Sequence, residues 1–72
     1  MKLKINGEIK NINHSDEEFF LEGLIKQLGY RPQLVVVELN GAIINSQEWG
    51  NTKIKDGDCL EVVTIVGGGS YS

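Results

Sequence analysis

The sequence predicts an α+β fold, in which one main helix lies across one face of a mixed sheet of four or five strands. Three observations support this prediction: a first segment in which apolar and polar residues alternate, a helical segment with an apolar stripe, and two later β-branched runs. The chain has 72 residues, which suffices for one domain only. The helix and the strands must therefore share a single hydrophobic core.

The first two strands are predicted to form a hairpin. Residues 1–5 alternate apolar and polar side chains with period two, which is typical of a half-buried strand. Asn6-Gly7 follows, and this pair favours a type I′ turn, whose two central residues both need positive φ. Residues 8–12 then read as the returning strand, and their looser alternation suits a twisted edge.

A helix is predicted to begin at Ser15 and to end at Gly29. Ser15 and Glu18 have the spacing of a capping box, in which each side chain bonds the other residue's backbone N–H. Gly23 lies inside the helix and is expected to mark close packing against a strand, whereas Gly29 is expected at the C′ position. The apolar stripe that repeats every 3.6 residues consists of Phe20, Leu21, Leu24, Ile25 and Leu28.

A β-branched run at residues 34–39 predicts a strand that is buried on both faces over much of its course. Asn40-Gly41 favours a second tight turn, after which residues 42–44 form a short returning strand. Trp49 is the only large apolar residue of the loop at residues 45–51, and we expect it to pin that loop to the core.

The last strand is predicted at residues 59–66, after a turn at residues 55–58. If the two longest apolar runs are to be buried, the first and last strands should pair at the centre of the sheet, and the path between them makes this pair parallel. This order of elements is the β-grasp arrangement. We expect it to occupy residues 1–66, with residues 67–72 as a flexible, glycine-rich tail.

Composition and charge argue against several classes of partner. The formal net charge is −3 and the pI is about 4.9, so no basic patch is expected for nucleic acid or an anionic membrane. The single cysteine, Cys59, excludes an internal disulfide and fits a reducing compartment. The amino terminus lacks a signal-peptide pattern, and no apolar run approaches the roughly 20 residues of a membrane span. We therefore expect a cytoplasmic monomer.

No set of polar residues predicts a catalytic or metal site. His14 has no ligand-type partner at metal-binding spacing, so it reads as a solvated turn residue. Turn chemistry explains Asp56 and Asp58. Cys59 reads as an ordinary residue at the start of a strand rather than as a persulfide or thioester partner. An enzyme in its own right is therefore the least favoured class.

Several short segments, taken in order and spacing, resemble one known family. They are Ile5-Asn6-Gly7-Glu8, Leu39-Asn40-Gly41, Glu48-Trp49, Asp56-Gly57-Asp58, Leu60-Glu61-Val62-Val63 and the glycines Gly67-Gly68-Gly69. With these segments the chain is similar, over nearly its whole length, to the ThiS family of sulfur carriers in thiamine biosynthesis, which have the ubiquitin-like β-grasp fold. The loop at Glu48-Trp49 makes the chain more similar to this family than to its molybdopterin-pathway relative.

The resemblance implies a chemistry at Gly69. A terminal carboxylate is a poor electrophile, so a ThiF-like adenylating enzyme would activate it with ATP and Mg. A sulfur donor such as a cysteine desulfurase would then convert the acyl-adenylate to a thiocarboxylate, which donates sulfur to a ThiG-like thiazole synthase. Val66, Gly67 and Gly68 would thread into the partner, because a Cβ could block a narrow channel. On this reading the carrier binds no cofactor stably.

The chain departs from the family pattern after Gly69. The family ends at Gly-Gly, whereas this chain continues with Ser70-Tyr71-Ser72. An internal peptide carbonyl has no free carboxylate, so Gly69 cannot be adenylated while these residues follow it. A protease removes the tripeptide, or the carrier is inactive, or the extension is a cloning remnant. We favour processing, which leaves Gly69 as the residue that bears the carboxyl group.

The last strand also predicts a docking surface. If every second residue from Leu60 to Thr64 faces the helix, the residues between them face outward. Apolar residues on an open sheet face suggest a partner surface. The alternative is that the chain's own loop covers them, with Trp49. The candidate docking residues are Glu61, Val63 and Ile65.

Three other functions stay open at this point. The chain could be a ubiquitin-like modifier whose Gly69 forms an isopeptide bond with a lysine, a molybdopterin-type sulfur carrier, or an interaction domain whose tail is never cleaved. All of them share the fold, so the fold cannot distinguish them. The intact mass of the protein from its own organism can distinguish a thiocarboxylate, a covalent adduct and an uncleaved tail.

Overall fold

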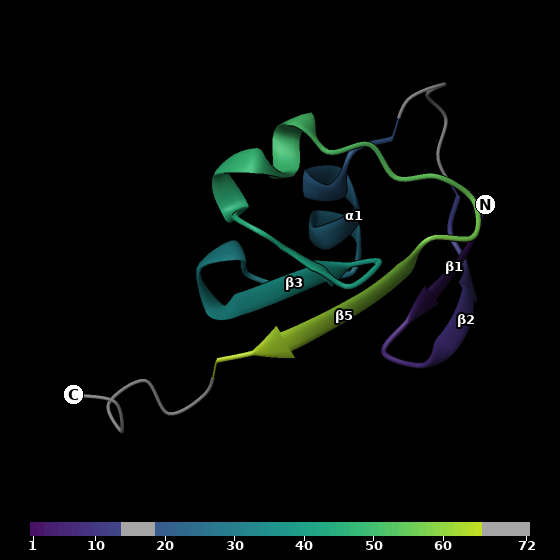
Figure 1. Cartoon of the computed structure of the whole chain (residues 1–72), viewed down its shortest axis with the longest axis horizontal. Helices are drawn as coiled ribbons and strands as arrows, with labels where there is room; N and C mark the ends of the chain where they lie inside the picture. The colour runs from purple at the N-terminus through teal and green to yellow at the C-terminus, as the bar shows by residue number, and fades with distance from the viewer. Residues whose placement is uncertain (14–18, 66–72) are drawn as a thin grey trace.

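The computed structural model describes residues 1–13 and 19–65 of the chain (Figure 1). Within these residues it has five strands, one α-helix and two short 3₁₀ helices. Their bounds, in chain order, are β1 Lys2–Ile5, β2 Glu8–Asn11, α1 Leu21–Gln27, η1 Pro32–Leu34, β3 Val35–Leu39, β4 Ala42–Ile44, η2 Ser46–Asn51 and β5 Cys59–Thr64.

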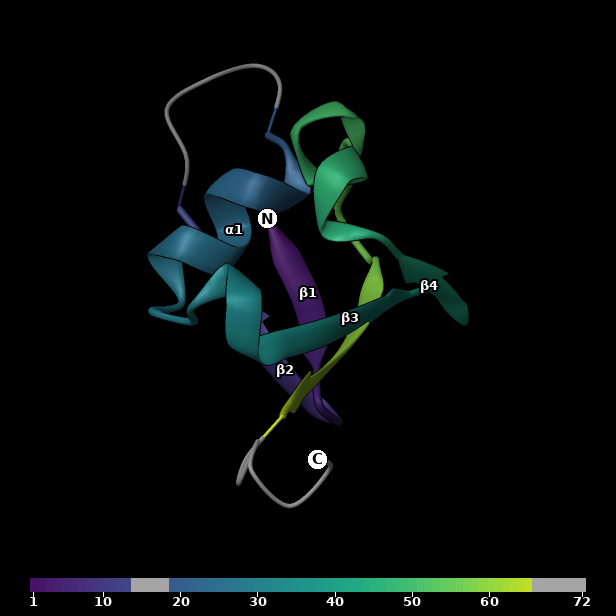
Figure 2. The ribbon, with the colours of Figure 1, turned by 90° about the vertical axis from the view of Figure 1, so that its left-hand side faces the viewer.

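The five strands form one mixed sheet in the order β2-β1-β5-β3-β4. β1 and β5 are neighbours and run parallel, with Lys4 opposite Cys59 and Ile5 opposite Leu60. The other neighbouring strands run antiparallel. Figures 1 and 2 show α1 against one face of this sheet. The predicted parallel pairing of the first and last strands is confirmed, and with it the β-grasp arrangement.

The hydrophobic core lies between α1 and one face of the sheet. Leu21, Leu24 and Ile25 of the helix have no exposed surface, as the apolar stripe predicts. Leu28 is partly buried and packs against them. The buried hydrophobic residues that complete this cluster are Leu3, Ile5, Ile12, Val35, Val37, Trp49, Ile54, Leu60 and Val62. Most of them alternate along strands, so that one face of the sheet is apolar.

Trp49 pins its loop to the core, as predicted. The residues around it form η2, and the Trp49 side chain is only 2% exposed. Its indole Nε1–H donates a hydrogen bond to the backbone oxygen of Ile44, at 3.0 Å. A buried indole N–H needs such a partner, so the carbonyl at the end of β4 both satisfies the ring and fixes its position.

Both Asn-Gly pairs form tight turns with positive φ at the two central residues. The φ angles are 52° at Asn6 and 84° at Gly7, and 51° at Asn40 and 90° at Gly41. The first pair joins β1 to β2 and the second joins β3 to β4. These signs are those of a type I′ turn, whose twist matches that of the strands.

The helix begins later than predicted. It starts at Leu21, and Phe20 before it has an extended backbone with φ −106° and ψ 156°. Phe20 forms an isolated bridge to Lys53, and Leu21 N–H donates to the oxygen of Thr52 at 2.8 Å. This long-range pairing holds the backbone extended, so the predicted helix start at Ser15 is wrong. The capping box of Ser15 with Glu18 lies outside the described residues.

The end of the helix is formed as predicted, with Gly29 at C′. Its φ is +87°, a left-handed conformation that glycine adopts without a Cβ clash. Gly29 N–H donates to the oxygen of Lys26 at 3.0 Å, and Tyr30 N–H donates to the oxygen of Ile25 at 3.2 Å. This pair of bonds is a Schellman motif, which satisfies carbonyls that the helix leaves without partners.

Gly23 does not lie against a strand, contrary to the prediction. It is exposed on α1. A Cβ built at this position would come within 3.3 Å of the Phe19 ring, and no strand atom lies among its close neighbours. The missing Cβ at Gly23 therefore leaves room for the ring of Phe19, in the segment that leads into the helix.

β3 is buried on one face only, so the prediction of two buried faces is wrong. Val35 and Val37 are buried, whereas Val36 between them is 38% exposed. Leu34, at the end of η1, is 43% exposed. A continuous β-branched run does not show how many faces are covered. Here a single helix covers one face, and it leaves every second valine on the other.

Candidate docking surface

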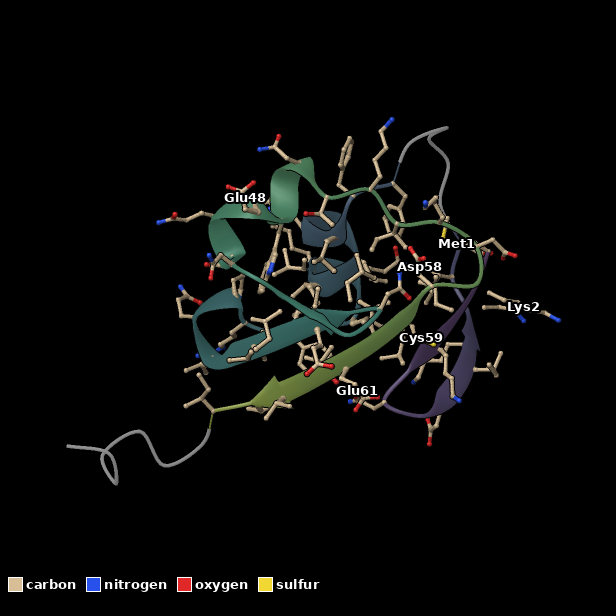
Figure 3. The ribbon with its side chains drawn as sticks, viewed as in Figure 1. Met1, Lys2, Glu48, Asp58, Cys59 and Glu61 are labelled. Carbon is tan, nitrogen blue, oxygen red and sulfur yellow. The ribbon has the colours of Figure 1, made fainter. Side chains whose placement is uncertain are left out.

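The sheet face away from α1, here called the open face, carries the predicted docking residues. In β5, Leu60 and Val62 are buried, whereas Glu61 and Val63 are exposed. Figure 3 shows Glu61 on the side of β5 away from α1. The predicted division of β5 into an inner and an outer row is thus present. Thr64, at the end of the inner row, is exposed as well.

Three apolar side chains form what we call the tail-side patch: Val36 of β3, Val63 of β5, and Ile65 just after the end of β5. Val36 and Val63 lie opposite each other in the β3–β5 register. Val63 is 61% exposed and Ile65 is 42% exposed. Trp49 lies buried in the core instead of over this patch, so the alternative in which the chain's own loop covers these residues is wrong.

An acidic pair lies beside the tail-side patch. Glu61 of β5 and Glu38 of β3 are directly opposite each other in the antiparallel register. Within the part of the chain that the structure describes, neither carboxylate has a hydrogen-bond or ion-pair partner. Like charges at directly opposite positions destabilise a sheet. The open face therefore keeps an unfavourable pair in the free protein.

Hydrogen bonds that involve side chains hold the start of β5 in place. Asp58 is 8% exposed, and its carboxylate accepts hydrogen bonds from the Lys55 N–H at 2.7 Å and from the Asn40 side-chain amide at 3.1 Å. The Asn40 side-chain oxygen accepts from the Cys59 N–H at 3.0 Å. Asp56 accepts from the Lys2 N–H at 2.6 Å. The bond from the Lys55 N–H to Asp58 is local to the turn, whereas Asp56 bonds Lys2, 54 positions away, and Asp58 also bonds Asn40, 18 positions away. The prediction that turn chemistry alone explains both aspartates is therefore wrong. The Cys59 thiol is free and exposed.

Asn6 has a role that its turn signal did not reveal. Its side chain reaches β5, where the Val62 N–H donates to Oδ1 at 2.7 Å and Nδ2 donates to the Val62 oxygen at 3.3 Å. The two residues are 56 positions apart. Sequence reasoning had no signal for this contact, because an asparagine before glycine is already explained by the turn.

The remaining predicted site residues lie outside the described part of the chain. They are Val66, Gly67, Gly68 and Gly69, together with the extension Ser70-Tyr71-Ser72. His14 lies outside it too. Residues 1–13 and 19–65 contain no cluster of three or more His, Cys, Asp or Glu side chains that could hold a metal ion. None of the helices in these residues is long and apolar enough to cross a membrane.

A mixed five-stranded sheet with one helix across one face defines a ubiquitin-like β-grasp protein. The model of the ThiS family matches residues 3–69. The chain therefore belongs to the ThiS family, as the resemblance in its sequence predicts.

Three related proteins support the same assignment. The crystal structure of the thiamine biosynthesis protein ThiS from Geobacter metallireducens superposes with a TM-score of 0.79 at 29% identity, covering 93% of this chain and 97% of that one. Thiazole synthases of Magnetococcus marinus and Paramagnetospirillum magneticum are 37% and 40% identical to this chain, over 71 and 70 residues. The matches cover 99% and 97% of this chain but 21% of each synthase, so the chain spans about a fifth of their length.

Proposed function

We propose that this protein is a sulfur carrier in the formation of the thiazole part of thiamine. Membership of the ThiS family is the observation that carries this proposal. The similarity to a thiamine biosynthesis protein and to part of two thiazole synthases supports it from separate relatives. The protein acts as a substrate of partner enzymes, and its folded part presents a tail to them.

The reaction takes place on the carboxyl group of Gly69. An adenylating enzyme joins this carboxylate to the α-phosphate of ATP, with Mg as the counter-ion, and pyrophosphate leaves. The outer sulfur of a persulfide, supplied through a cysteine desulfurase, then attacks the acyl carbon and AMP leaves, which gives an acyl disulfide. A thiol cleaves its S–S bond by exchange, and this two-electron reduction releases the thiocarboxylate while the thiol is oxidised to a disulfide. Val66, Gly67 and Gly68 form the segment that threads into the active site of the partner. ATP and Mg belong to that partner.

Removal of the residues after Gly69 precedes this reaction. The match to the family model ends at residue 69, which supports Gly69 as the end of the functional carrier. Ser70-Tyr71-Ser72 lie beyond the match. A processing protease that cuts after Gly69 therefore frees the carboxylate, and the uncut chain is an inactive precursor.

The open face docks the carrier on its partners. The tail-side patch supplies exposed apolar surface immediately before the tail, which is where a partner must hold the chain to reach Gly69. Glu61 beside it attracts a basic group of the partner, because its pairing with Glu38 is unfavourable in the free protein. A thiazole synthase is one such partner: in two relatives with that name, a region similar to this chain is part of the same protein.

Intact mass spectrometry of the protein from its own organism tests the function. We expect a species that ends at Gly69 and a second species heavier by the mass difference between sulfur and oxygen. A chain ending at Gly69 should gain this mass in vitro with the adenylating enzyme, Mg-ATP and a sulfur donor. The 72-residue chain should not gain it under the same conditions.

The other outcomes contradict the proposal. Covalent adducts between Gly69 and lysines of other proteins would identify a ubiquitin-like modifier. Persistence of Ser70-Tyr71-Ser72 in the cell, with no thiocarboxylate, would identify an interaction domain or an inactive carrier. Transfer of the sulfur to a molybdopterin precursor instead of a thiazole would identify the carrier of that pathway.

A further inference from the structure

The side chain of Asn6 continues the ladder between β1 and β5 by one position. The Asn6 backbone N–H donates to the Leu60 oxygen at 2.9 Å, which is the last backbone contact along this edge. The chain then turns away at Gly7, which has positive φ. At the next position on β5, the Asn6 carboxamide takes the place of a peptide group: it accepts from the Val62 N–H and donates to the Val62 oxygen.

Val62 is consequently the last residue of β5 that is held from both sides. On the β3 side, pairing continues through Val35 opposite Thr64, and the Ile65 N–H bonds the Leu34 oxygen at 2.6 Å. On the β1 side, the hairpin ends at the Asn6 turn. Figure 1 shows β5 running on past this turn beside β3 alone.

We propose that Asn6 is a positioning residue for the tail. By holding Val62 it braces β5 from the β1 side at the point beyond which the strand is paired with β3 alone, and so it steadies the base from which the chain leads on to Gly69. Gly69 lies seven positions after Val62, a stretch of chain that spans at most about 25 Å when extended. The inference rests on the proposed function.

The turn alone does not require an asparagine side chain. Glycine adopts positive φ more easily than asparagine, so an Asn6→Gly substitution keeps the turn and removes only the bonds to Val62. Aspartate can still accept from the Val62 N–H, but it has no N–H for the Val62 oxygen. If Asn6 served the turn only, both substitutions would leave kcat for adenylation unchanged.

Asn40 offers a matched control on the opposite side of β5. It occupies the same position of a similar turn, with φ 51°, and its side chain also bonds β5. Its contacts are with Asp58 and the Cys59 N–H, at the start of the strand. An Asn40→Gly substitution thus removes an equivalent side chain without touching the end from which the tail leaves.

The test measures adenylation of the chain ending at Gly69, with each variant shown to be folded at the assay temperature. For Asn6→Gly we expect kcat to fall by about tenfold or more, because the reacting carboxyl group is misplaced. KM should stay within about threefold, because the tail-side patch is intact. The kcat of Asn6→Asp should lie between those of the unsubstituted chain and of Asn6→Gly. Asn40→Gly should keep the kcat of the unsubstituted chain. Amide exchange at Val62 should quicken in Asn6→Gly.

Two results would overturn the inference while leaving the proposed function standing. One is an unchanged kcat for Asn6→Gly, and the other is an equal loss of kcat in Asn40→Gly, which would show general destabilisation. Unchanged exchange at Val62 would refute the structural premise. If the unsubstituted chain ending at Gly69 is not adenylated at all, the proposed function fails and the inference fails with it.

Discussion

The two ends of β5 differ in what surrounds them. At its start, Asp58 is buried and bonded to Lys55 and Asn40, and the turn side chains fix the backbone on both sides. At its end, the apolar Val63 is 61% exposed, and Ile65, just after the strand, is 42% exposed. Among residues 1–13 and 19–65, one side chain, that of Asn6, holds this end from the β1 side.

This difference separates stability from recognition along a single strand. The start of β5 satisfies its polar groups within the chain, so substitutions there should change folding. The end leaves apolar surface without a partner, and such surface is typical of an interaction site. Substitutions at that end should change binding and leave folding nearly unaltered. Four predictions test this division, beginning with the largest effect.

Leu60→Ala should destabilise the protein most. Leu60 is 1% exposed and lies in the core opposite Ile5, so its truncation loses apolar contact and leaves a cavity. We expect a loss of about 2–5 kcal/mol in the free energy of unfolding, measured by urea denaturation. Val63→Ala in the same strand is the control, and its loss should be much smaller. Equal losses in the two variants would refute the division.

Asp58→Ala should have the next largest effect on folding. It leaves the Lys55 N–H and the Asn40 amide without their acceptor in a half-buried place, which costs about 1–3 kcal/mol of stability. Asp56→Ala is the matched control, because the hydrogen bond that Asp56 accepts from the Lys2 N–H is exposed and water can replace it. Thermal unfolding of both variants measures the contrast. A larger loss for Asp56→Ala would contradict it.

Val63→Asp should weaken docking while the fold is kept. A carboxylate at the centre of an apolar contact must be desolvated on binding, so we expect affinity for the adenylating enzyme to fall by about tenfold or more. Ile9→Asp is the control. Ile9 lies on the open face too, opposite Lys4 on β1, and is 66% exposed, but it is far from the tail-side patch in the strand order. Unchanged affinity for Val63→Asp, measured by calorimetry, would sink the docking proposal.

Glu61→Gln should have the smallest effect on stability, and the effect should be a gain. The substitution removes the repulsion between Glu61 and Glu38, which amounts to a few tenths of a kcal/mol, up to about 1 kcal/mol. The gain should shrink at high salt, because salt screens exposed charges. Glu8→Gln is the control, since Glu8 lies opposite Ile5 instead of a carboxylate. A gain of equal size in both variants would reflect net charge alone.

Local signals predicted the parts of the fold that depend on neighbouring residues. The two Asn-Gly turns, Gly29 at the helix end and the alternation of Glu61 with its neighbours all follow from backbone geometry over a few residues. The helix start failed because Phe20 pairs with Lys53, far along the chain. The prediction that β3 is buried on both faces failed, because a run of valines does not show that only one face is covered.

The candidate site could be predicted only in part, for the same reason. The alternation of side chains along a strand predicted that Glu61 and Val63 point away from the helix. Whether anything covers them depends on where Trp49 and α1 lie. The bond between Asn6 and Val62 joins residues 56 positions apart. No local pattern encodes that contact, since the same asparagine is accounted for by its turn.

The parallel pairing of β1 with β5 also governs when the protein can fold. The first strand, β1, pairs with the last strand, β5, at the centre of the sheet. The sheet therefore cannot form completely until β5 has left the ribosome. Contacts of this sequence separation form late and slowly, because a long loop must be ordered first. The strand that presents the tail is the strand that completes the core. An incomplete chain therefore has no assembled tail-side patch, because Val63 reaches its place opposite Val36 only when β5 joins the sheet.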